Sequence, residues 1–358
     1  KEFFEKYNSA VSIEYMSNIE IEEGLNLNVC MDARYVIPKK VKEFLPDIVI
    51  SFGGNIFAGI KEQFRKFAGE FEHWLVQEDG RVVDLYKSIT TIFECKPEYF
   101  FKYCVNVADE NQTNDCEYYQ GLKRYVDSVI YPDFPYSHVY AIKEVVEKIP
   151  EDSVLHLSIN DSIRITNFFK LNPRIKTYAN IGTHGIDGCL SSFLGQAATG
   201  NKQSYLVIGD LAFFYDMNAM RLRHIKNNVH ILLINNEGGS EFYFNHMWKD
   251  EASDLHTTAR HHTKAEGWVK SNNFIYLSAH DKESMQEALK EFMRSDLEKP
   301  VFLEVFTEMK TDSDVIYDFF DLSRPKDVQS ETIRKSKEFI KATIGQEKAQ
   351  KIAGLFKK

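Results

Sequence analysis

Short, continuous apolar runs separated by helix-like segments dominate the C-terminal part of the chain. The runs that read as strands are residues 154–159, 175–180, 204–209, 229–235, 273–278 and 301–306. Helical patterns lie between them, notably at 185–200 and 282–295. Continuous apolar strands are typical of parallel sheets that are covered by helices on both faces. The pattern therefore predicts a doubly wound α/β domain over residues 151–321.

The N-terminal part shows the same alternation less regularly. Asp47–Phe52 is the clearest strand, followed by a predicted helix at 56–69 and a predicted strand at 72–77. A helix is predicted over 97–107, and the polar stretch 106–116 is typical of a linker. The β-α-β rhythm indicates a second parallel sheet. The predicted division is an α/β domain at 1–115, a helical connection at 116–150, the domain at 151–321 and a helical tail at 322–358.

The composition argues against some classes of protein. The 358 residues are 43% hydrophobic and 27% charged, with a net charge of −9. A nucleic-acid binder needs clustered Lys and Arg, so no nucleic-acid partner is expected. The five scattered cysteines favour free thiols in a reducing cytoplasm over a disulfide framework. No segment is apolar and long enough to predict a membrane span. The chain lacks an initiating Met, and we expect a piece of a longer protein.

Two strand ends carry candidate chemistry. One predicted strand ends in Gly209-Asp210, and the next ends in Asn235-Asn236, which are followed by Gly238-Gly239. Ligands of such sheets bind at the carboxyl ends of strands, and these two ends are one strand–helix–strand step apart. A carboxylate, an amide oxygen and a glycine carbonyl suit Mg²⁺ or Ca²⁺, completed by water and phosphate oxygens. A plain helix cap at Asp210 and a plain turn at the glycines remain the alternatives.

A third segment makes the pattern specific. "GIDG" at 185–188 follows a strand, "GDLAFFYDMNAM" spans 209–220, and "NNEGGSEF" spans 235–242. Together they resemble the thiamine diphosphate motif, and most closely the menaquinone-pathway 2-succinyl-5-enolpyruvyl-6-hydroxy-3-cyclohexene-1-carboxylate synthases. Leu211 stands where the general motif has Gly, as in those synthases. The resemblance implies a Rossmann-like central domain at 1–115, with its first strand missing, ahead of the diphosphate-binding domain.

The resemblance also implies roles for single residues. Asp210, Asn236 and the carbonyl of Gly238 would hold Mg²⁺, or Mn²⁺ or Ca²⁺ in its place, on the diphosphate of the cofactor. Glu241 and His184 would lie near its reacting end, as candidate catalytic residues. Ser162 and Arg164 match a substrate-binding segment. The implied cofactor-binding residues are Ile186, Gly209, Asp210, Leu211, Ala212, Asn236, Gly238 and Gly239.

The implied function is the C-terminal part of a thiamine diphosphate- and Mg²⁺-dependent 2-oxo acid decarboxylase or carboligase, a cytoplasmic homodimer or homotetramer. The N-terminal pyrimidine-binding domain of the family has no counterpart here, so this chain by itself is expected to be inactive. Ile181 replaces an arginine that binds substrate carboxylates in those synthases. A 2-oxo acid decarboxylase of polysaccharide or secondary biosynthesis is therefore one alternative, and a non-catalytic binding or scaffold module is the other.

Three histidines close together could form a zinc site. His256, His261 and His262 lie within "LHTTARHH", but no fourth soft ligand is near in sequence. The segment is instead predicted to be the polar face of an exposed helix.

Overall fold

The computed structural model describes residues 1–31, 38–54, 56, 59–110, 114–245 and 253–322. The chain divides into two compact units, Lys1–Leu322 and Ser323–Lys358. The second unit, and with it nearly all of the predicted tail, lies outside the described residues.

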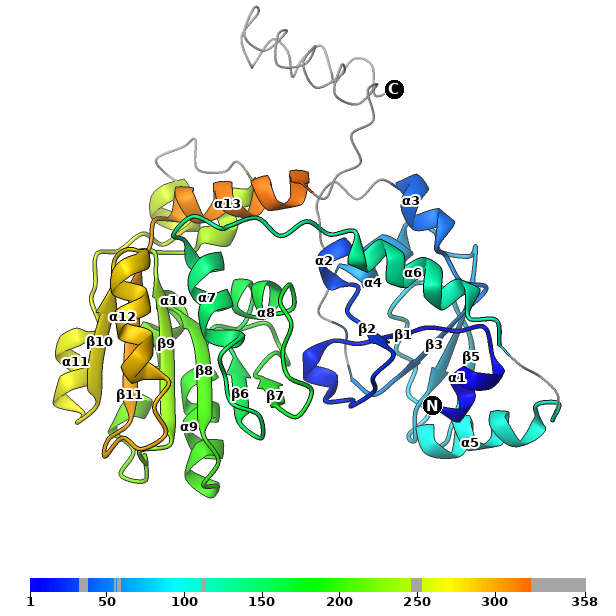
Figure 1. Cartoon of the computed structure of the whole chain (residues 1–358), viewed down its shortest axis with the longest axis horizontal. Coiled ribbons are helices and arrows are strands. Elements are labelled where there is room, and N and C mark those ends of the chain that lie inside the picture. Colours follow the sequence, from blue (N-terminus) through cyan, green and yellow to red (C-terminus); the bar gives the residue numbers. More distant parts are fainter. Residues whose placement is uncertain (32–37, 55, 57–58, 111–113, 246–252, 323–358) are drawn as a thin grey trace, which may run out of the picture. The chain divides into compact units, whose positions relative to one another are not determined.

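A six-stranded parallel sheet forms the C-terminal part of the first unit, with strand order β10-β11-β9-β8-β6-β7. Its strands are β6 (Val154–Leu157), β7 (Lys176–Ala179), β8 (Ser204–Gly209), β9 (Val229–Asn235), β10 (Ile275–Ala279) and β11 (Val301–Phe306). All six apolar runs predicted from the sequence are strands. The chain leaves β6 towards β7 at one edge, then returns to β8 and continues towards β9 on the other side. This reversal makes the sheet doubly wound, as predicted (Figure 1).

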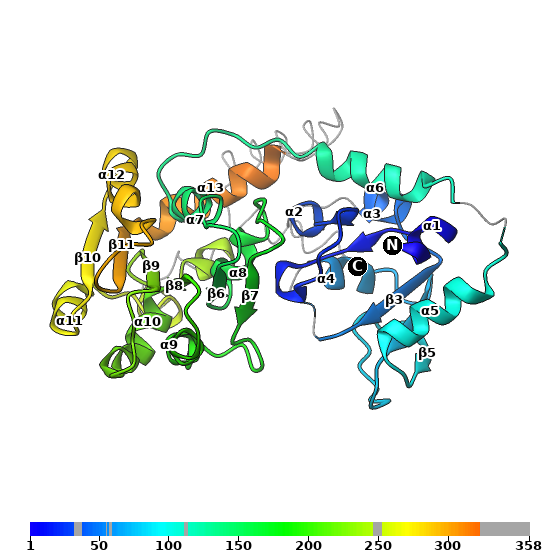
Figure 2. The same cartoon turned by 60° about the horizontal axis from the view of Figure 1, so that its bottom comes forward.

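Helices cover both faces of this sheet (Figure 2). On one face lie α7 (His138–Val146), α8 (Asp161–Thr166), α12 (Lys282–Phe292) and α13 (Met309–Leu322). On the other lie α9 (Cys189–Thr199), α10 (Asp210–Asp216) and α11 (Glu266–Ser271). Successive residues of β8 alternate between the two cores: Tyr205 and Val207 belong to one, Leu206 and Ile208 to the other. The continuous apolar runs follow from this burial on both faces.

The N-terminal part contains a three-stranded parallel sheet, in the order β3 (Ile48–Phe52), β4 (Glu72–Val76) and β5 (Ile89–Phe93). Strand β5, "ITTIF", was not predicted, because two adjacent threonines interrupt its apolar pattern. The other elements are α1 (Glu2–Lys6), β1 (Val11–Ser12), η1 (Tyr15–Ser17), β2 (Gly24–Leu25), α2 (Asn28–Met31), α3 (Pro38–Glu43), α4 (Ile60–Arg65), α5 (Pro97–Val107) and α6 (Glu117–Asp127).

The α/β class with parallel sheets is thus confirmed, whereas the predicted domain boundaries stay predictions. All five cysteines are free thiols. Among the described residues, no helix combines the length and the apolar character that crossing a bilayer requires.

Candidate functional site

The reversal of the six-stranded sheet falls between β6 and β8, and ligands of such sheets bind at the carboxyl ends of strands at this switch point. Residues Asn160 and Asp161 follow β6, and Asp210 follows β8. Strand β9 is the next neighbour and ends at Asn235, directly before Asn236. The fold therefore brings the polar residues of three strand ends to one edge.

Asp210 is the centre of this edge. It is only 2% exposed, at the first residue of α10. Its Oδ2 accepts hydrogen bonds from the backbone nitrogens of Asn236 at 3.1 Å and Gly238 at 3.0 Å. Its Oδ1 accepts from the backbone nitrogen of Leu211 at 2.6 Å. The carboxylate delivered by the buried strand β8 thus holds the loop after β9, and the predicted metal ligands lie side by side.

The loop after β9 requires glycine at Gly238. Its φ is +151°, a conformation that residues with a side chain rarely adopt. A Cβ there would lie 2.7 Å from the backbone oxygen of Thr258 and 3.2 Å from Sδ of Met309. The backbone nitrogen of Gly239 donates to the same Thr258 oxygen at 2.7 Å. The loop is therefore packed tightly against two other segments, residues 258–263 and the start of α13.

The side chain of Asn236 is held from the opposite side by Asp312, in the first turn of α13. Its Nδ2 donates to Oδ2 of Asp312 at 2.9 Å, and Thr307 donates its hydroxyl to the same oxygen at 2.7 Å. The backbone nitrogen of His138 donates to Oδ1 at 2.8 Å. Burial favours the neutral acid, but the His138 ring and these donors outweigh it and hold the pKa of Asp312 below its usual range.

His138 continues the polar network towards β6. Its ring nitrogens lie 3.3 Å from Asp312 and 3.7 Å from Asp161, within ion-pair distance but not aligned for hydrogen bonds. Burial disfavours the charged ring, but the two carboxylates outweigh it, and the pKa of His138 is raised. Asp161 also accepts from the hydroxyl of Ser240 at 2.9 Å. A chain of buried and half-buried polar groups therefore runs from Asn236 to Asp161 at the start of α8.

Arg164 joins this network to the candidate catalytic residue Glu241. Its guanidinium lies 3.1 Å from Oδ1 of Asp161 and 3.3 Å from Oε1 of Glu241. The structure thus brings a predicted substrate-binding residue and a predicted catalytic residue together. The two terminal nitrogens of the guanidinium, Nη1 and Nη2, thus each lie against a carboxylate of this chain. Its proposed contact with a substrate carboxylate would compete with these two ion pairs.

His261, considered from the sequence only as a zinc ligand, lies instead beside Asp210. Nε2 lies 3.3 Å from Oδ2 of Asp210, and contact with this carboxylate raises the pKa of His261. The prediction of an exposed polar helix was wrong here, because Ser253–Thr257 forms a single π-helical turn and His261 lies beyond it, mostly buried. The hydrogen bond from its backbone nitrogen to the Glu237 oxygen, at 3.1 Å, fixes the segment against the loop. The sequence offered three nearby histidines here but no sign that one of them contacts Asp210.

The other predicted residues lie on the same edge. Gly209 ends β8, and a Cβ there would meet open space. Ala212 belongs to α10, and its side chain is buried in the core between this helix and the sheet. Ile186 is half-buried and packs against that core, while His184 is exposed and has a left-handed φ of 56°. Ser162 is buried on α8.

The donor set at Asp210 suits a hard cation. Within the described ranges, no three His, Cys, Asp or Glu side chains gather closely enough to hold a metal on their own. Any cation at Asp210 therefore needs amide, carbonyl, water or phosphate oxygens as well. The backbone nitrogens of Asn236 and Gly238 lie against the carboxylate, and these two residues also carry an amide oxygen and a carbonyl oxygen, the latter accepting from the nitrogen of Ser240 at 3.2 Å. This is the partial, oxygen-only set typical of Mg²⁺ shared with a phosphate ligand.

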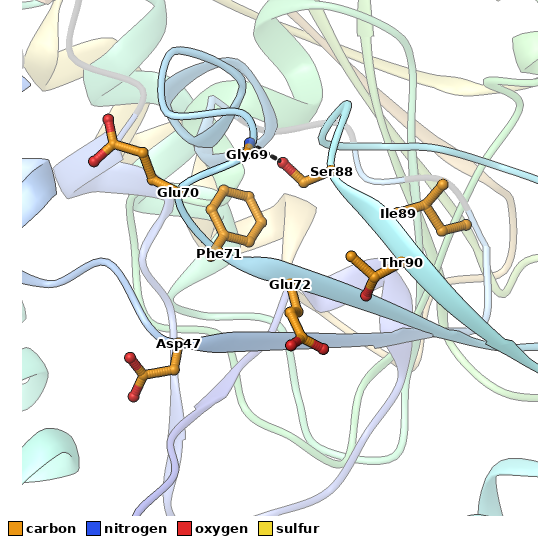
Figure 3. Close-up of a pocket in the computed structure, with 8 residues that line it drawn as sticks. All are labelled: Asp47, Gly69, Glu70, Phe71, Glu72, Ser88, Ile89 and Thr90. Atoms are coloured by element: carbon orange, nitrogen blue, oxygen red, sulfur yellow. Dashed lines mark hydrogen bonds between the residues drawn. The ribbon is translucent and has the colours of Figure 1, made fainter.

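A separate pocket of about 440 Å³ lies at the starts of β3, β4 and β5 (Figure 3). Its acidic residues are Asp47, Glu70 and Glu72. Glu70 pairs with Lys42 at 2.6 Å, and Glu72 accepts from the Trp74 indole at 2.8 Å. The pocket opens at the amino ends of the strands, opposite the edge where parallel sheets bind ligands. We assign no function to it.

Comparison with curated proteins identifies several relatives that share one name. The chain is 34% identical over 291 residues to the 2-succinyl-5-enolpyruvyl-6-hydroxy-3-cyclohexene-1-carboxylate synthase of Bacteroides thetaiotaomicron, covering 80% of this chain and 52% of the relative. The enzymes of that name from Phocaeicola vulgatus and Flavobacterium psychrophilum are 33% and 32% identical, over 79% and 77% of this chain.

The chain is homologous to these synthases. It spans about half the length of the relatives it matches, 51% and 50% for the last two. No protein-family model matches the chain. The homology covers most of this chain and agrees with the resemblance seen in its motifs.

Proposed function

We propose that this chain provides the diphosphate- and metal-binding part of a thiamine diphosphate-dependent 2-oxo acid decarboxylase or carboligase. The observation that carries the proposal is the buried Asp210 carboxylate at the switch point, bonded to the backbone of Asn236 and Gly238. Homology to the synthases supports it independently. The resemblance to the menaquinone-pathway synthases favours a carboligase, and a 2-oxo acid decarboxylase of polysaccharide or secondary biosynthesis is the alternative.

Asp210, the amide oxygen of Asn236 and the carbonyl oxygen of Gly238 would hold Mg²⁺ against the diphosphate. The hydrogen bonds that Asp210 already accepts keep the loop in place, so little reorganisation is needed when the cation binds. Ile186 packs against the core beside α9 and offers an apolar surface to the middle of the cofactor. When bound, thiamine diphosphate supplies an electron sink for decarboxylation of the 2-oxo acid.

The reacting end of the site would involve Glu241, His184, Ser162 and Arg164. Glu241 and Arg164 already form an ion pair, which would orient both groups beside the bound 2-oxo acid. Relatives extend well beyond this chain, so we propose that a pyrimidine-binding domain, and a homodimer or homotetramer in the cytoplasm, complete the enzyme. Without that domain, we expect this chain to bind the cofactor only through its diphosphate end, and therefore weakly.

The test is calorimetric titration of the chain with thiamine diphosphate in the presence and absence of Mg²⁺. We expect binding only with Mg²⁺, and we expect Asp210→Asn to abolish it. Asn keeps an acceptor for the loop but removes the negative charge that attracts the cation. The matched control is Asp216→Asn on the same helix, whose carboxylate accepts from the nitrogen and hydroxyl of Ser191 at 2.7 and 2.8 Å.

Asp216→Asn should bind the cofactor like the wild type. If Asp210→Asn does so too, the metal assignment is wrong. If the wild-type chain shows no heat at millimolar ligand, the non-catalytic scaffold becomes the better interpretation.

A further inference from the structure

Asp312 is a fully buried carboxylate, 0% exposed, that none of the predicted roles explains. Its Oδ1 accepts from the backbone nitrogen of His138, and its Oδ2 accepts from Thr307 and from Nδ2 of Asn236. Burying a carboxylate is costly unless its oxygens are paired. The three bonds, of 2.7 to 2.9 Å, therefore fix both its position and its orientation.

These bonds also determine which edge of the Asn236 amide faces Asp312. A carboxylate accepts hydrogen bonds and donates none, so only the amide nitrogen can face it. The amide oxygen then lies on the other edge of the planar group. The backbone nitrogen of Asn236 donates to Asp210 at 3.1 Å, which keeps this residue beside the other carboxylate. The oxygen is the atom that a divalent cation takes as a ligand.

We propose that Asp312 is a positioning residue for the cation site: it holds the nitrogen of Asn236 and so presents the amide oxygen to the metal. This inference rests on the proposed function. Asp312 acts through Asn236 and does not touch the cation. Partners that orient metal ligands in this way typically contribute ~10–100-fold to metal affinity.

The substitution Asp312→Asn creates a conflict that has no good solution. If the new amide nitrogen takes the Oδ2 position, it faces the nitrogen of Asn236, and two donors oppose each other. If the new amide turns over, its nitrogen faces the backbone N–H of His138 instead. Asn236 can relieve the first conflict only by turning its own amide, which points N–H groups at the cation. Mn²⁺ affinity should therefore fall ~10–100-fold.

The reciprocal swap provides a rescue. In the double variant Asn236→Asp/Asp312→Asn, the new amide at 312 donates to the new carboxylate at 236, and the hydroxyl of Thr307 turns to accept from it. The remaining oxygen of residue 236 faces the cation. Residues 236 and 312 have exchanged donor and acceptor, so the hydrogen bond between them is kept, and the total charge is unchanged. Mn²⁺ affinity should return to within about threefold of the wild type or better.

The measurement is titration of Mn²⁺ by electron paramagnetic resonance in the presence of inorganic pyrophosphate, with thermal unfolding recorded separately without metal. Thr307→Val is the control for lost stability. It removes one hydrogen bond to Asp312, worth about 1 kcal/mol, and leaves the bond from Asn236 intact. We expect Thr307→Val to change Mn²⁺ affinity less than about threefold. Mn²⁺ titration of Asp210→Asn tests whether the cation binds at the proposed site at all.

The outcomes separate the two proposals. Mn²⁺ binding that is lost in Asp210→Asn but unchanged in Asp312→Asn overturns the positioning role and leaves the proposed function standing. Equal losses in Thr307→Val and Asp312→Asn overturn it too, because affinity then follows stability. A wild type that binds no Mn²⁺ removes both proposals. Should Asp312→Asn fail to fold, the double variant decides: a folded protein that binds Mn²⁺ supports the role, and one that does not bind refutes it.

Discussion

Gly238→Ala tests whether the loop after β9 is as tightly constrained as the structure indicates. The residue has a φ of +151°, and an added Cβ would lie 2.7 Å from the backbone oxygen of Thr258. That oxygen belongs to backbone and cannot move aside as a flexible side chain can. It also accepts the hydrogen bond from the nitrogen of Gly239 at 2.7 Å. The variant must therefore either strain the backbone or break this contact.

The expected loss of stability is the sum of two parts. Holding a residue with a side chain in such a backbone conformation costs about 1–3 kcal/mol. Weakening the hydrogen bond between Gly239 and Thr258 costs about 1 kcal/mol more. The free energy of unfolding should fall by roughly 2–4 kcal/mol. Because the same loop carries two of the proposed cation ligands, affinity for Mn²⁺ should fall as well.

The assay is urea unfolding followed by circular dichroism, compared with Gly195→Ala. Gly195 lies inside α9, where an added Cβ meets no atom within 4 Å. Alanine there should stabilise the helix by up to about 1 kcal/mol. The two substitutions are chemically identical, so their opposite signs isolate the effect of position. If Gly238→Ala unfolds within about 0.5 kcal/mol of the wild type, the reasoning about this loop is wrong.

Two further predictions concern pH and activity. The pKa of His138 is raised in the folded chain, so its contribution to stability is present below the ordinary histidine pKa of about 6.5 and is lost as pH rises through the higher folded value. The stability difference between wild type and His138→Gln should therefore shrink as pH rises above about 6.5, and a constant difference would contradict the ion pairs. With cofactor and Mg²⁺, the chain alone should release no ¹³CO₂ from labelled pyruvate or 2-oxoglutarate above the free-cofactor rate, because in the proposed function a pyrimidine-binding domain would be needed to preorganise the reacting end. Steady release would instead direct mutagenesis to Glu241.

The sequence predicted the large sheet well because burial on both faces leaves a strong signal. Strands β8, β9 and β11 are nearly continuous apolar runs, and the polar residue that follows β8 marks the candidate site. Strand β5 was missed because Thr90 and Thr91 interrupt its pattern, although threonine suits a strand. The predicted residues at the ends of β8 and β9 do lie together, since strand order alone brings them there.

What the sequence could not predict is how those residues are supported. His138 is the first residue of α7 and reads as an ordinary helix start, yet it lies between two carboxylates. Asp312 comes shortly after β11, so the strand-end argument that singled out Asp210 applies to it too. Asp312 lies in the first turn of α13, and nothing in the sequence pairs it with Asn236 as the structure does. Contacts between residues this far apart in the chain depend on packing of α7 and α13 over the same edge, which no local pattern encodes. The proposed ligand roles of Asp210 and Asn236 can therefore be expected from the sequence, while the orientation of the Asn236 amide, on which its proposed use as a ligand depends, is a property of the folded chain.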